Sequence, residues 1–306
     1  MYDLTIIGAG PAGSAGAVYA ARKQLKTALI TKEFGGQSTA SLDVQNWIGT
    51  PSISGEQLGK DLEKHVRAYA GDVVHIEIDG VKTLQKKDGH FLVGTEKGKS
   101  FESKTVLVTA GGERRKLKVA GADTFENKGL TYCASCDGPL FTGMDVAVIG
   151  GGNAGFETAA QLLAYTKSVT LLQNSDTYAA DPITVTKVLA HPNMKGLTNT
   201  SITEVLGEAF VTGITYKDVK TGAETTLPVN GIFIEIGLVP GTQFLEGVVA
   251  LDTFKRVVID CKDQKTSVPG IWAAGDCTNG LYHQNNIAAG DAVKALEDIY
   301  LFLNAY

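Results

Sequence analysis

Short apolar runs that end in a glycine-rich turn occur twice along the chain. In the first copy, residues 3–7 (DLTII) predict a strand, residues 8–13 (GAGPAG) a turn, and residues 14–24 an Ala-rich helix. A second apolar strand is predicted at residues 27–31 (TALIT). This order is typical of a dinucleotide-binding unit, because the glycines let the backbone approach a pyrophosphate and the helix N-terminus offers it unpaired N–H groups.

The second copy begins at residues 145–149 (DVAVI), which predict a strand. Residues 150–155 (GGGNAG) repeat the full G-x-G-x-x-G motif, and a helix and a strand are predicted at 156–166 and 168–173. One such motif alone is a weak signal, whereas two with the same surroundings, 142 residues apart, predict two dinucleotide-binding units. The alternative is a loop that turns the chain and binds no nucleotide, and it applies more to the second loop.

Each unit ends in a very apolar strand that runs into glycine, at residues 105–112 and 231–237. A third apolar strand, at 270–277 (GIWAAGDC), lies beyond both units and is followed by a predicted helix that runs to residue 306. If this strand returns to the first unit, the second unit is inserted within the first. We therefore predict an α/β fold of two Rossmann-like dinucleotide-binding domains, the second inserted into the first.

Composition narrows the class of protein further. The 306 residues suffice for about two domains, and 28 Lys and Arg against 33 Asp and Glu leave a net charge of −5. Because no basic stripe is visible, we expect no nucleic-acid partner. Residues 4–21 carry no charge, but no Lys or Arg precedes them and they fit a strand, a turn and a helix. We therefore expect no signal peptide, no membrane span and a cytoplasmic location.

Four cysteines are present, and two of them form the motif Cys133-Ala134-Ser135-Cys136. This spacing suits a reversible disulfide at a helix start, where the helix dipole favours a thiolate. Zinc would need two more ligands, and the remaining Cys261 and Cys277 form no second C-x-x-C, so we favour redox chemistry and expect no metal. Cys261 and Cys277 are interpreted as inert thiols. Asp137 is either a helix cap or the acid that protonates a leaving thiolate or a reduced flavin.

Seven motifs allow a comparison with known families. They are GAGPAG (8–13), EFGGQ (33–37), QNWIG (45–49), VTAGGERR (108–115), CASCDGPLF (133–141), IGGGNAGFE (149–157) and AAGDC (273–277). In this order they resemble the low-molecular-weight thioredoxin reductases over essentially the whole chain. The reductase module of the alkyl hydroperoxide reductase flavoprotein is similar too, notably in CDGPLF and in IGLVP (236–240). We expect a stand-alone reductase of the thioredoxin reductase type.

The resemblance implies an FAD-binding domain at 1–115 and 248–306, and an inserted nicotinamide-type domain at 116–247 that carries the C-x-x-C. It also implies a thioredoxin-like partner, a homodimer, and rotation of the inserted domain about hinges near 113–118 and 243–248. The implied catalytic residues are Cys133, which attacks the partner, Cys136, which faces the flavin, and Asp137. The implied FAD-binding residues are Gly8, Gly10, Pro11, Ala12, Gly13, Glu33, Gly36, Gln37, Asn46, Thr109, Ala110, Gly111, Asp276, His283, Gln284, Asn285 and Ala288. The implied nicotinamide-binding residues are Gly150, Gly152, Asn153, Ala154, Gly155, Glu157 and Gln173.

Two departures from the family pattern concern the electron donor. NADPH-using members carry a His-Arg-Arg cluster for the 2′-phosphate, whereas residues 173–176 here are Gln-Asn-Ser-Asp, without a positive charge. NADPH is therefore disfavoured, and NADH is possible because Asp176 could reach a ribose. His283 replaces the family's Arg or Lys before Gln284, which we interpret as a packing change; stacking on a flavin that a different donor reduces is the alternative.

Three functions remain open. The first is an FAD-dependent dithiol–disulfide oxidoreductase, reduced by NADH or by a non-nicotinamide donor such as ferredoxin or another flavin. The second is a flavin reductase between nicotinamide and ferredoxin, which has no use for a C-x-x-C. The third is a non-enzymatic flavin- or nucleotide-binding redox sensor with the cysteine pair as its switch.

Overall fold

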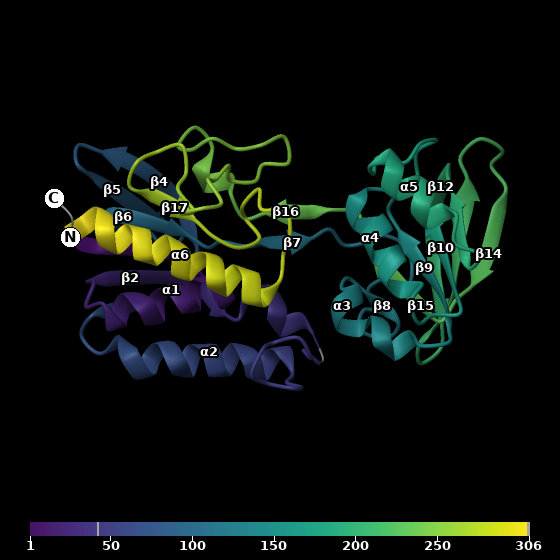
Figure 1. Ribbon diagram of the computed structural model, residues 1–306, viewed down its shortest axis with the longest axis horizontal. Coiled ribbons are helices and arrows are strands. Elements are labelled where there is room, and N and C mark those ends of the chain that lie inside the picture. The colour runs from purple at the N-terminus through teal and green to yellow at the C-terminus, as the bar shows by residue number, and fades with distance from the viewer. Residues whose placement is uncertain (42, 305–306) are drawn as a thin grey trace. The chain divides into compact units, whose positions relative to one another are not determined.

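The computed structural model describes residues 1–41 and 43–304, which form two compact units (Figure 1). The first unit comprises Met1–Glu113 and Val239–Tyr306, and the second comprises Arg114–Leu238. The second unit is thus inserted into the chain of the first, as predicted.

The first unit contains a seven-stranded sheet of order β3-β2-β1-β6-β5-β4, with β17 beside β6. β17 runs parallel to β6 and pairs Trp272 with Leu107, which confirms that the third apolar strand returns to the first unit. β4 and β5 form an antiparallel hairpin that turns at Asp88-Gly89. The strands are β1 (Tyr2–Ala9), β2 (Thr27–Phe34), β3 (Val74–Ile78), β4 (Val81–Lys87), β5 (His90–Thr95), β6 (Ser100–Val108) and β17 (Ile271–Ala273).

Three helices cover this sheet: α1 (Pro11–Arg22), α2 (Gly55–Ala70) and α6 (Asn285–Asn304). α1 packs against both α2 and α6 (Figure 1). Small side chains on α1 and α6 let the helices come close to the strands, and their core includes the fully buried Leu29, Trp272 and Leu296. A short 3-10 helix, η1 (Gly36–Ala40), follows β2.

The second unit repeats the same arrangement around a five-stranded parallel sheet of order β11-β10-β9-β15-β8. A separate antiparallel sheet of order β12-β13-β14 belongs to the same unit. Its strands are β8 (Leu130–Thr131), β9 (Asp145–Ile149), β10 (Ser168–Leu172), β11 (Met194–Leu197), β12 (Thr200–Gly207), β13 (Val211–Asp218), β14 (Glu224–Pro228) and β15 (Gly231–Ile234). Its helices are α3 (Ala134–Asp137), η2 (Gly138–Phe141), α4 (Asn153–Leu162) and α5 (Pro182–Leu189).

The two connections between the units pair with each other as β7 (Gly112–Arg114) and β16 (Leu238–Pro240). The predicted insertion ended at residue 247, whereas the compact second unit ends at Leu238. The reason is packing: the side chain of Leu245, in η3 (Gln243–Leu245), is completely buried in the core of the first unit. Residues 239–247 therefore belong to the first unit.

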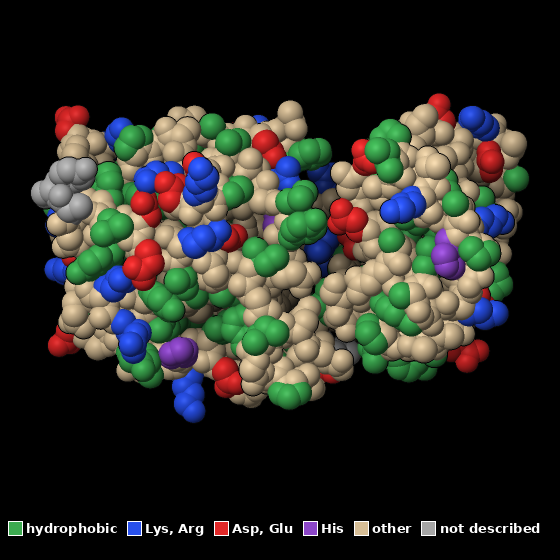
Figure 2. Space-filling model, in the orientation of Figure 1, with side chains coloured by type: hydrophobic (Ala, Val, Ile, Leu, Met, Phe, Trp, Pro, Cys, Tyr) green, Lys and Arg blue, Asp and Glu red, His purple; other side chains and the backbone are tan. Residues whose placement is uncertain are grey.

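Within the described residues, no helix combines the length and the apolar character needed to cross a bilayer. On the face shown in Figure 2, acidic and basic side chains are interspersed on each unit. This distribution matches the small net charge of −5.

Candidate dinucleotide and dithiol sites

The first glycine loop fits so closely against the end of β6 that only glycine is accommodated at two of its positions. Gly8 has φ of +99°, and a Cβ on it would lie 2.4 Å from the carbonyl oxygen of Thr109. A Cβ on Gly13 would lie 1.8 Å from the carbonyl oxygen of Gly8. A Cβ on Gly10, by contrast, would meet nothing nearer than 3.9 Å. The first and third glycines of the motif thus serve packing, and the middle one leaves open space.

That open space lies at the N-terminus of α1. Gly10 is the N-cap of α1 and supplies no side-chain cap, while Ser14 N–H bonds to the Gly10 carbonyl oxygen at 2.9 Å. The N-terminal turns of α1 and α6 meet at Gly275, since a Cβ there would lie 3.4 Å from Ala12 Cβ and 3.2 Å from Ala288 Cβ. Two neighbouring helix N-termini, with the open Gly10 at the start of α1, fit the pyrophosphate of a dinucleotide such as FAD.

Side chains far apart in the sequence are joined next to this loop. Asn46 Nδ2 donates to Gln284 Oε1 at 3.1 Å, and Asn286 Nδ2 donates to the Asn46 carbonyl oxygen at 2.7 Å. Ser38 Oγ, on η1, donates to Asn285 Oδ1 at 3.0 Å. The segments that carry Gln37, Asn46, Gln284 and Asn285 are thus held together.

The remaining predicted FAD residues lie around the same edge of the sheet. Glu33 is exposed near the end of β2, and Ala110, Gly111 and Asp276 are half-buried where β6 and β17 end. Within the part of the chain that the structure describes, the buried Nε2 of His283 has no hydrogen-bond partner. A buried ring nitrogen in this state fits a position beside a cofactor's polar edge.

The second glycine loop has the same internal geometry as the first. Gly150 has φ of +120°, and a Cβ on Gly155 would lie 1.9 Å from the Gly150 carbonyl oxygen. A Cβ on Gly152, the N-cap of α4, would meet nothing within 4 Å. Asn153 and Ala154 form the exposed first turn of α4, and Asn153 Oδ1 accepts a hydrogen bond from Asp181 N–H at 2.8 Å. This loop, too, has room for a phosphate at a helix N-terminus.

The side chain of Gln173 is engaged with the loop itself. Its Oε1 accepts a hydrogen bond from Gly151 N–H at 2.9 Å, and its Nε2 donates to Ser175 Oγ at 2.6 Å. Asn174 and Asp176 are exposed. Gln173 therefore shapes the loop, while the exposed positions beside it are the ones that could meet the adenosine ribose.

A buried carboxylate that the sequence analysis did not identify stands next to this loop. Glu235 directly follows β15, and its side chain is only 5% exposed. Arg114 Nη1 lies 3.1 Å from Glu235 Oε2, and Thr158 Oγ1 donates to Oε1 at 2.8 Å. Burial raises the pKa of the Glu235 carboxyl above its ordinary value, although Arg114 and Thr158 act in the opposite direction. Glu157, on α4, is exposed and adds to the raised pKa through its negative charge.

Cys133 and Cys136 form a disulfide, with their Cα atoms 5.3 Å apart. Cys133 is the N-cap of the short helix α3, and Cys136 N–H donates to Cys133 Sγ at an N···S distance of 3.2 Å. The turn packs against α4, where Ser135 Oγ donates to Gln161 Oε1 at 3.1 Å. The expected redox pair is thus formed and is held at a helix start.

Asp137, the last residue of α3, has a partner that the sequence did not indicate. Thr131, at the end of β8, donates a hydrogen bond from its hydroxyl to Asp137 Oδ2. The two residues are six positions apart, and a strand end and the cysteine turn separate them. A hydroxyl two residues before a C-x-x-C-D motif is a signal that could have been noticed.

The other two cysteines are free. Cys277 is completely buried, and burial raises the pKa of its thiol to about 12. Cys261 is exposed. Burial fits the interpretation of Cys277 as an inert thiol, whereas Cys261 lies at the surface, where a reagent can reach it.

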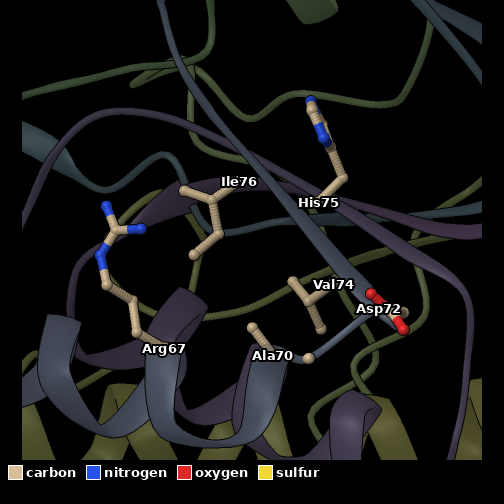
Figure 3. Close-up of a pocket in the computed structure, with 7 residues that line it drawn as sticks. Arg67, Ala70, Asp72, Val74, His75 and Ile76 are labelled. Carbon is tan, nitrogen blue, oxygen red and sulfur yellow. The ribbon is translucent and has the colours of Figure 1, made fainter.

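A cavity of about 560 Å³ lies elsewhere in the first unit (Figure 3). Its lining comes from the end of α2 and the start of β3 and includes Arg67, Asp72 and His75. Val74 pairs with Thr27, the first residue of β2, so the cavity lies at the amino ends of parallel strands. Dinucleotides bind at the carboxyl ends of such strands, and the cavity is therefore separate from the glycine-loop site.

Comparisons with known proteins agree with this geometry. The family model of the pyridine nucleotide-disulphide oxidoreductases matches residues 2–292. An NADH dehydrogenase of Bacillus subtilis (strain 168) is 40% identical over 294 residues, which are 96% of this chain and 57% of the relative. An alkyl hydroperoxide reductase protein of Xanthomonas campestris pv. phaseoli is 41% identical over 295 residues, which are 96% of this chain and 56% of the relative. The chain thus spans little more than half the length of these curated relatives.

Solved structures match over the full chain. A thioredoxin reductase from Streptococcus pyogenes MGAS5005 superposes with a TM-score of 0.91 at 31% identity, covering 100% of this chain and 99% of that chain. One from Giardia duodenalis gives a TM-score of 0.93 at 28% identity, covering 99% and 98%. The chain therefore belongs to the pyridine nucleotide-disulphide oxidoreductase family and has the fold of a thioredoxin reductase.

Proposed function

We propose that the protein is an FAD-dependent dithiol–disulfide oxidoreductase that delivers electrons through Cys133 and Cys136 to a thioredoxin-like protein. The disulfide at the start of α3, in the unit that also holds the second glycine loop, carries the proposal. A flavin reductase that serves ferredoxin would have no use for this pair, so the disulfide favours the proposed function over that alternative.

The first unit would hold the FAD. The pyrophosphate would lie at the N-termini of α1 and α6, beside Gly10 and Ala12, and Glu33 would bind a ribose hydroxyl. The segments joined through Asn46 and Gln284 would line the flavin. When bound, FAD supplies a two-electron carrier between a nicotinamide and the dithiol.

Three residues of the cysteine turn have separate roles in the thiol–disulfide exchange. Cys133 accepts the N–H of Cys136, and this bond together with its N-cap position favours a thiolate on Cys133, the sulfur that attacks the partner disulfide. Cys136 closes the disulfide again and would be the sulfur that takes electrons from the flavin, as the family resemblance implies. Asp137 moves the proton that this exchange requires.

The dithiol and the nicotinamide loop contact different parts of α4. The loop meets the helix at Asn153, whereas Ser135 contacts Gln161, eight residues or about 12 Å further along the helix. This separation supports alternating access of the two groups to one flavin, by rotation of the inserted unit on the β7–β16 connections. We propose hinges at these paired strands, so that the second hinge lies before the 243–248 expected from the sequence, where Leu245 is buried in the first unit.

For the electron donor, we propose NADH over NADPH. Residues 173–176 offer no positive charge to a 2′-phosphate, and Gln173 is already bound to Gly151. One of the relatives bears the name NADH dehydrogenase, which supports the same preference. For the acceptor, relatives that bear the name alkyl hydroperoxide reductase extend the range from thioredoxin to peroxide-reducing thiol proteins. We propose a homodimer on the family resemblance.

A direct test combines the purified protein, FAD, NADH and an oxidised thioredoxin. NADH-dependent formation of thioredoxin thiols is expected, and Cys136→Ser should bind FAD normally but form none. Activity that survives in Cys136→Ser, or no thiol formation with any of several thioredoxins and thiol peroxidases, would contradict the proposal.

A further inference from the structure

The hydroxyl of Thr131 connects the two sides of the cysteine turn. It donates to Asp137 Oδ2 and accepts from the Cys133 N–H at an N···O distance of 3.5 Å. A hydroxyl has one proton to donate, so the chain of hydrogen bonds has one direction, from Cys133 N–H through Thr131 to the Asp137 carboxylate. Thr131 is only 6% exposed, so water has little access to compete for the hydrogen bonds of its hydroxyl.

This arrangement has a chemical consequence for Asp137. A hydrogen bond donated to a carboxylate favours its ionised form and fixes its orientation. Asp137 directly follows Cys136, and its own N–H bonds to the Cys133 carbonyl oxygen at 3.0 Å. The carboxylate is thereby held on the turn that carries both sulfurs.

We propose that Thr131 is a positioning residue for thiol–disulfide exchange, holding the Asp137 carboxylate ionised and oriented so that it can accept the proton of Cys136. The inference rests on the proposed function, in which Cys133 and Cys136 are the exchanging pair.

The exchange with an external disulfide proceeds in two steps. First, the Cys133 thiolate attacks one external sulfur, which forms a mixed disulfide and releases one external thiolate. Second, Asp137 takes the proton of the Cys136 thiol, and the Cys136 sulfur attacks the Cys133 sulfur. The Cys133–Cys136 bond then forms and the second external thiolate leaves. Two electrons pass to the external disulfide, and the one thiol proton, that of Cys136, passes from Asp137 to solvent or to a released thiolate. Thr131 acts in the second step.

A merely structural role for the hydroxyl predicts a loss of stability only. A positioning role predicts a change in the pH dependence of the second step, because that step requires ionised Asp137. Removing the hydroxyl makes Asp137 easier to protonate, so the acid limb of the rate profile should move to higher pH.

The experiment uses 5,5′-dithiobis(2-nitrobenzoate) as the external disulfide and the dithiol-reduced full chain, and it needs no flavin turnover. A Cys261→Ser background removes the exposed thiol, while Cys277 stays buried. The two steps appear as two phases of thiol-anion release. In Thr131→Val the second phase should slow by about tenfold, the effect of losing one hydrogen bond to a charged group, and its acid limb should shift upward. Thr131→Ser keeps the hydroxyl and should stay within about twofold of the parent.

Thr166→Val is the matched control, because Thr166 is similarly buried in the same unit and its hydroxyl donates to a backbone oxygen, that of Leu162, at 2.8 Å. Its profile should coincide with the parent's. Asp137→Asn should slow the second phase, and adding Thr131→Val to it should change nothing further. If Thr131→Val does not fold, Thr131→Ala takes its place.

A Thr131→Val profile that coincides with the parent's, an equal shift in Thr166→Val, or additive effects in the double variant would overturn the inference. The proposed function fails in a different way. If the proposed function is wrong, the parent protein would exchange normally with 5,5′-dithiobis(2-nitrobenzoate) but would reduce no protein partner.

Discussion

The Oε1 atom of Gln173 lies 2.9 Å from the backbone nitrogen of Gly151 and accepts its hydrogen bond. Gln173, where the family resemblance places a 2′-phosphate, thus stabilises the glycine loop from within. Its amide nitrogen is engaged as well, with Ser175 Oγ at 2.6 Å. A new positive charge for NADPH is therefore best placed at the neighbouring, exposed Asn174.

Asn174→Arg should improve NADPH binding by at least about tenfold, because one hydrogen bond between charged groups contributes about 1.5–3 kcal/mol. NADH, which has no 2′-phosphate, should change little. Gln173→Arg should help less, because it removes the acceptor of Gly151 N–H. The test is to measure the dissociation constants of NADPH and NADH for the parent protein and for both variants. Failure of Asn174→Arg to favour NADPH would show that the second loop receives no nicotinamide nucleotide.

Gly10→Asp should abolish FAD binding without unfolding the protein. Asp is a favourable N-cap, and the atom nearest to a Cβ at Gly10 would be 3.9 Å away. The thermal midpoint of the apoprotein should therefore be unchanged. The carboxylate would repel the pyrophosphate at the N-terminus of α1. Gly152→Asp, the same change in the second loop, should bind FAD normally and lose NADH. The FAD content of each purified variant and its titration with NADH test these two expectations. A Gly10→Asp protein that retains its FAD would refute the assignment of the first loop to FAD.

Gly13→Ala should behave differently, since its Cβ would lie 1.8 Å from the Gly8 carbonyl oxygen. We expect destabilisation of about 1–3 kcal/mol or more from overpacking, seen as a lower thermal midpoint of the apoprotein. An unchanged midpoint would mean that α1 does not pack on β1 as described.

Glu235→Gln tests the buried carboxylate. Burial raises the pKa of Glu235 in the folded protein. Its contribution to stability is therefore present below the unfolded-state pKa and is lost as pH rises through the folded pKa. The wild-type protein should therefore lose thermal stability relative to Glu235→Gln as the pH rises above the ordinary glutamate pKa of 4.5. Glu224→Gln, at an exposed position of β14, is the control and should show no such trend. If the thermal midpoints of wild type and Glu235→Gln change with pH in the same way, the burial argument is contradicted.

Thiol counting tests the assignment of the four cysteines. In the native oxidised protein only Cys261 should react with a thiol reagent, because Cys277 is buried with a pKa near 12. Denaturation should expose Cys277 as a second thiol, and reduction should add Cys133 and Cys136. A rapidly reacting Cys277 in the native protein would be the contrary result.

The sequence predicted the parts of the fold that local patterns encode. Both glycine loops, the returning strand at Ile271–Ala273 and the cysteine pair follow from short motifs whose spacing alone restricts the backbone. The end of the insertion was predicted too late, because whether Leu245 packs in one core or the other depends on tertiary contacts that no local pattern records.

The sequence did not reveal the interactions that join separate elements. Glu235 occurs in a very apolar run, and its pairing with Arg114 joins segments 121 residues apart. Thr131 and Asp137 meet across the cysteine turn, and Gln173 bends back onto Gly151. Each depends on a side-chain direction that only the folded chain defines.

Anaerobic reductive titration counts the electrons that the flavin and the dithiol take up together. FAD-loaded wild-type protein should accept four electrons per flavin, two into FAD and two into the Cys133–Cys136 disulfide, with two new thiols at the end point. Cys136→Ser should accept two. A wild-type protein that accepts only two electrons and gains no thiols would contradict a disulfide oxidoreductase.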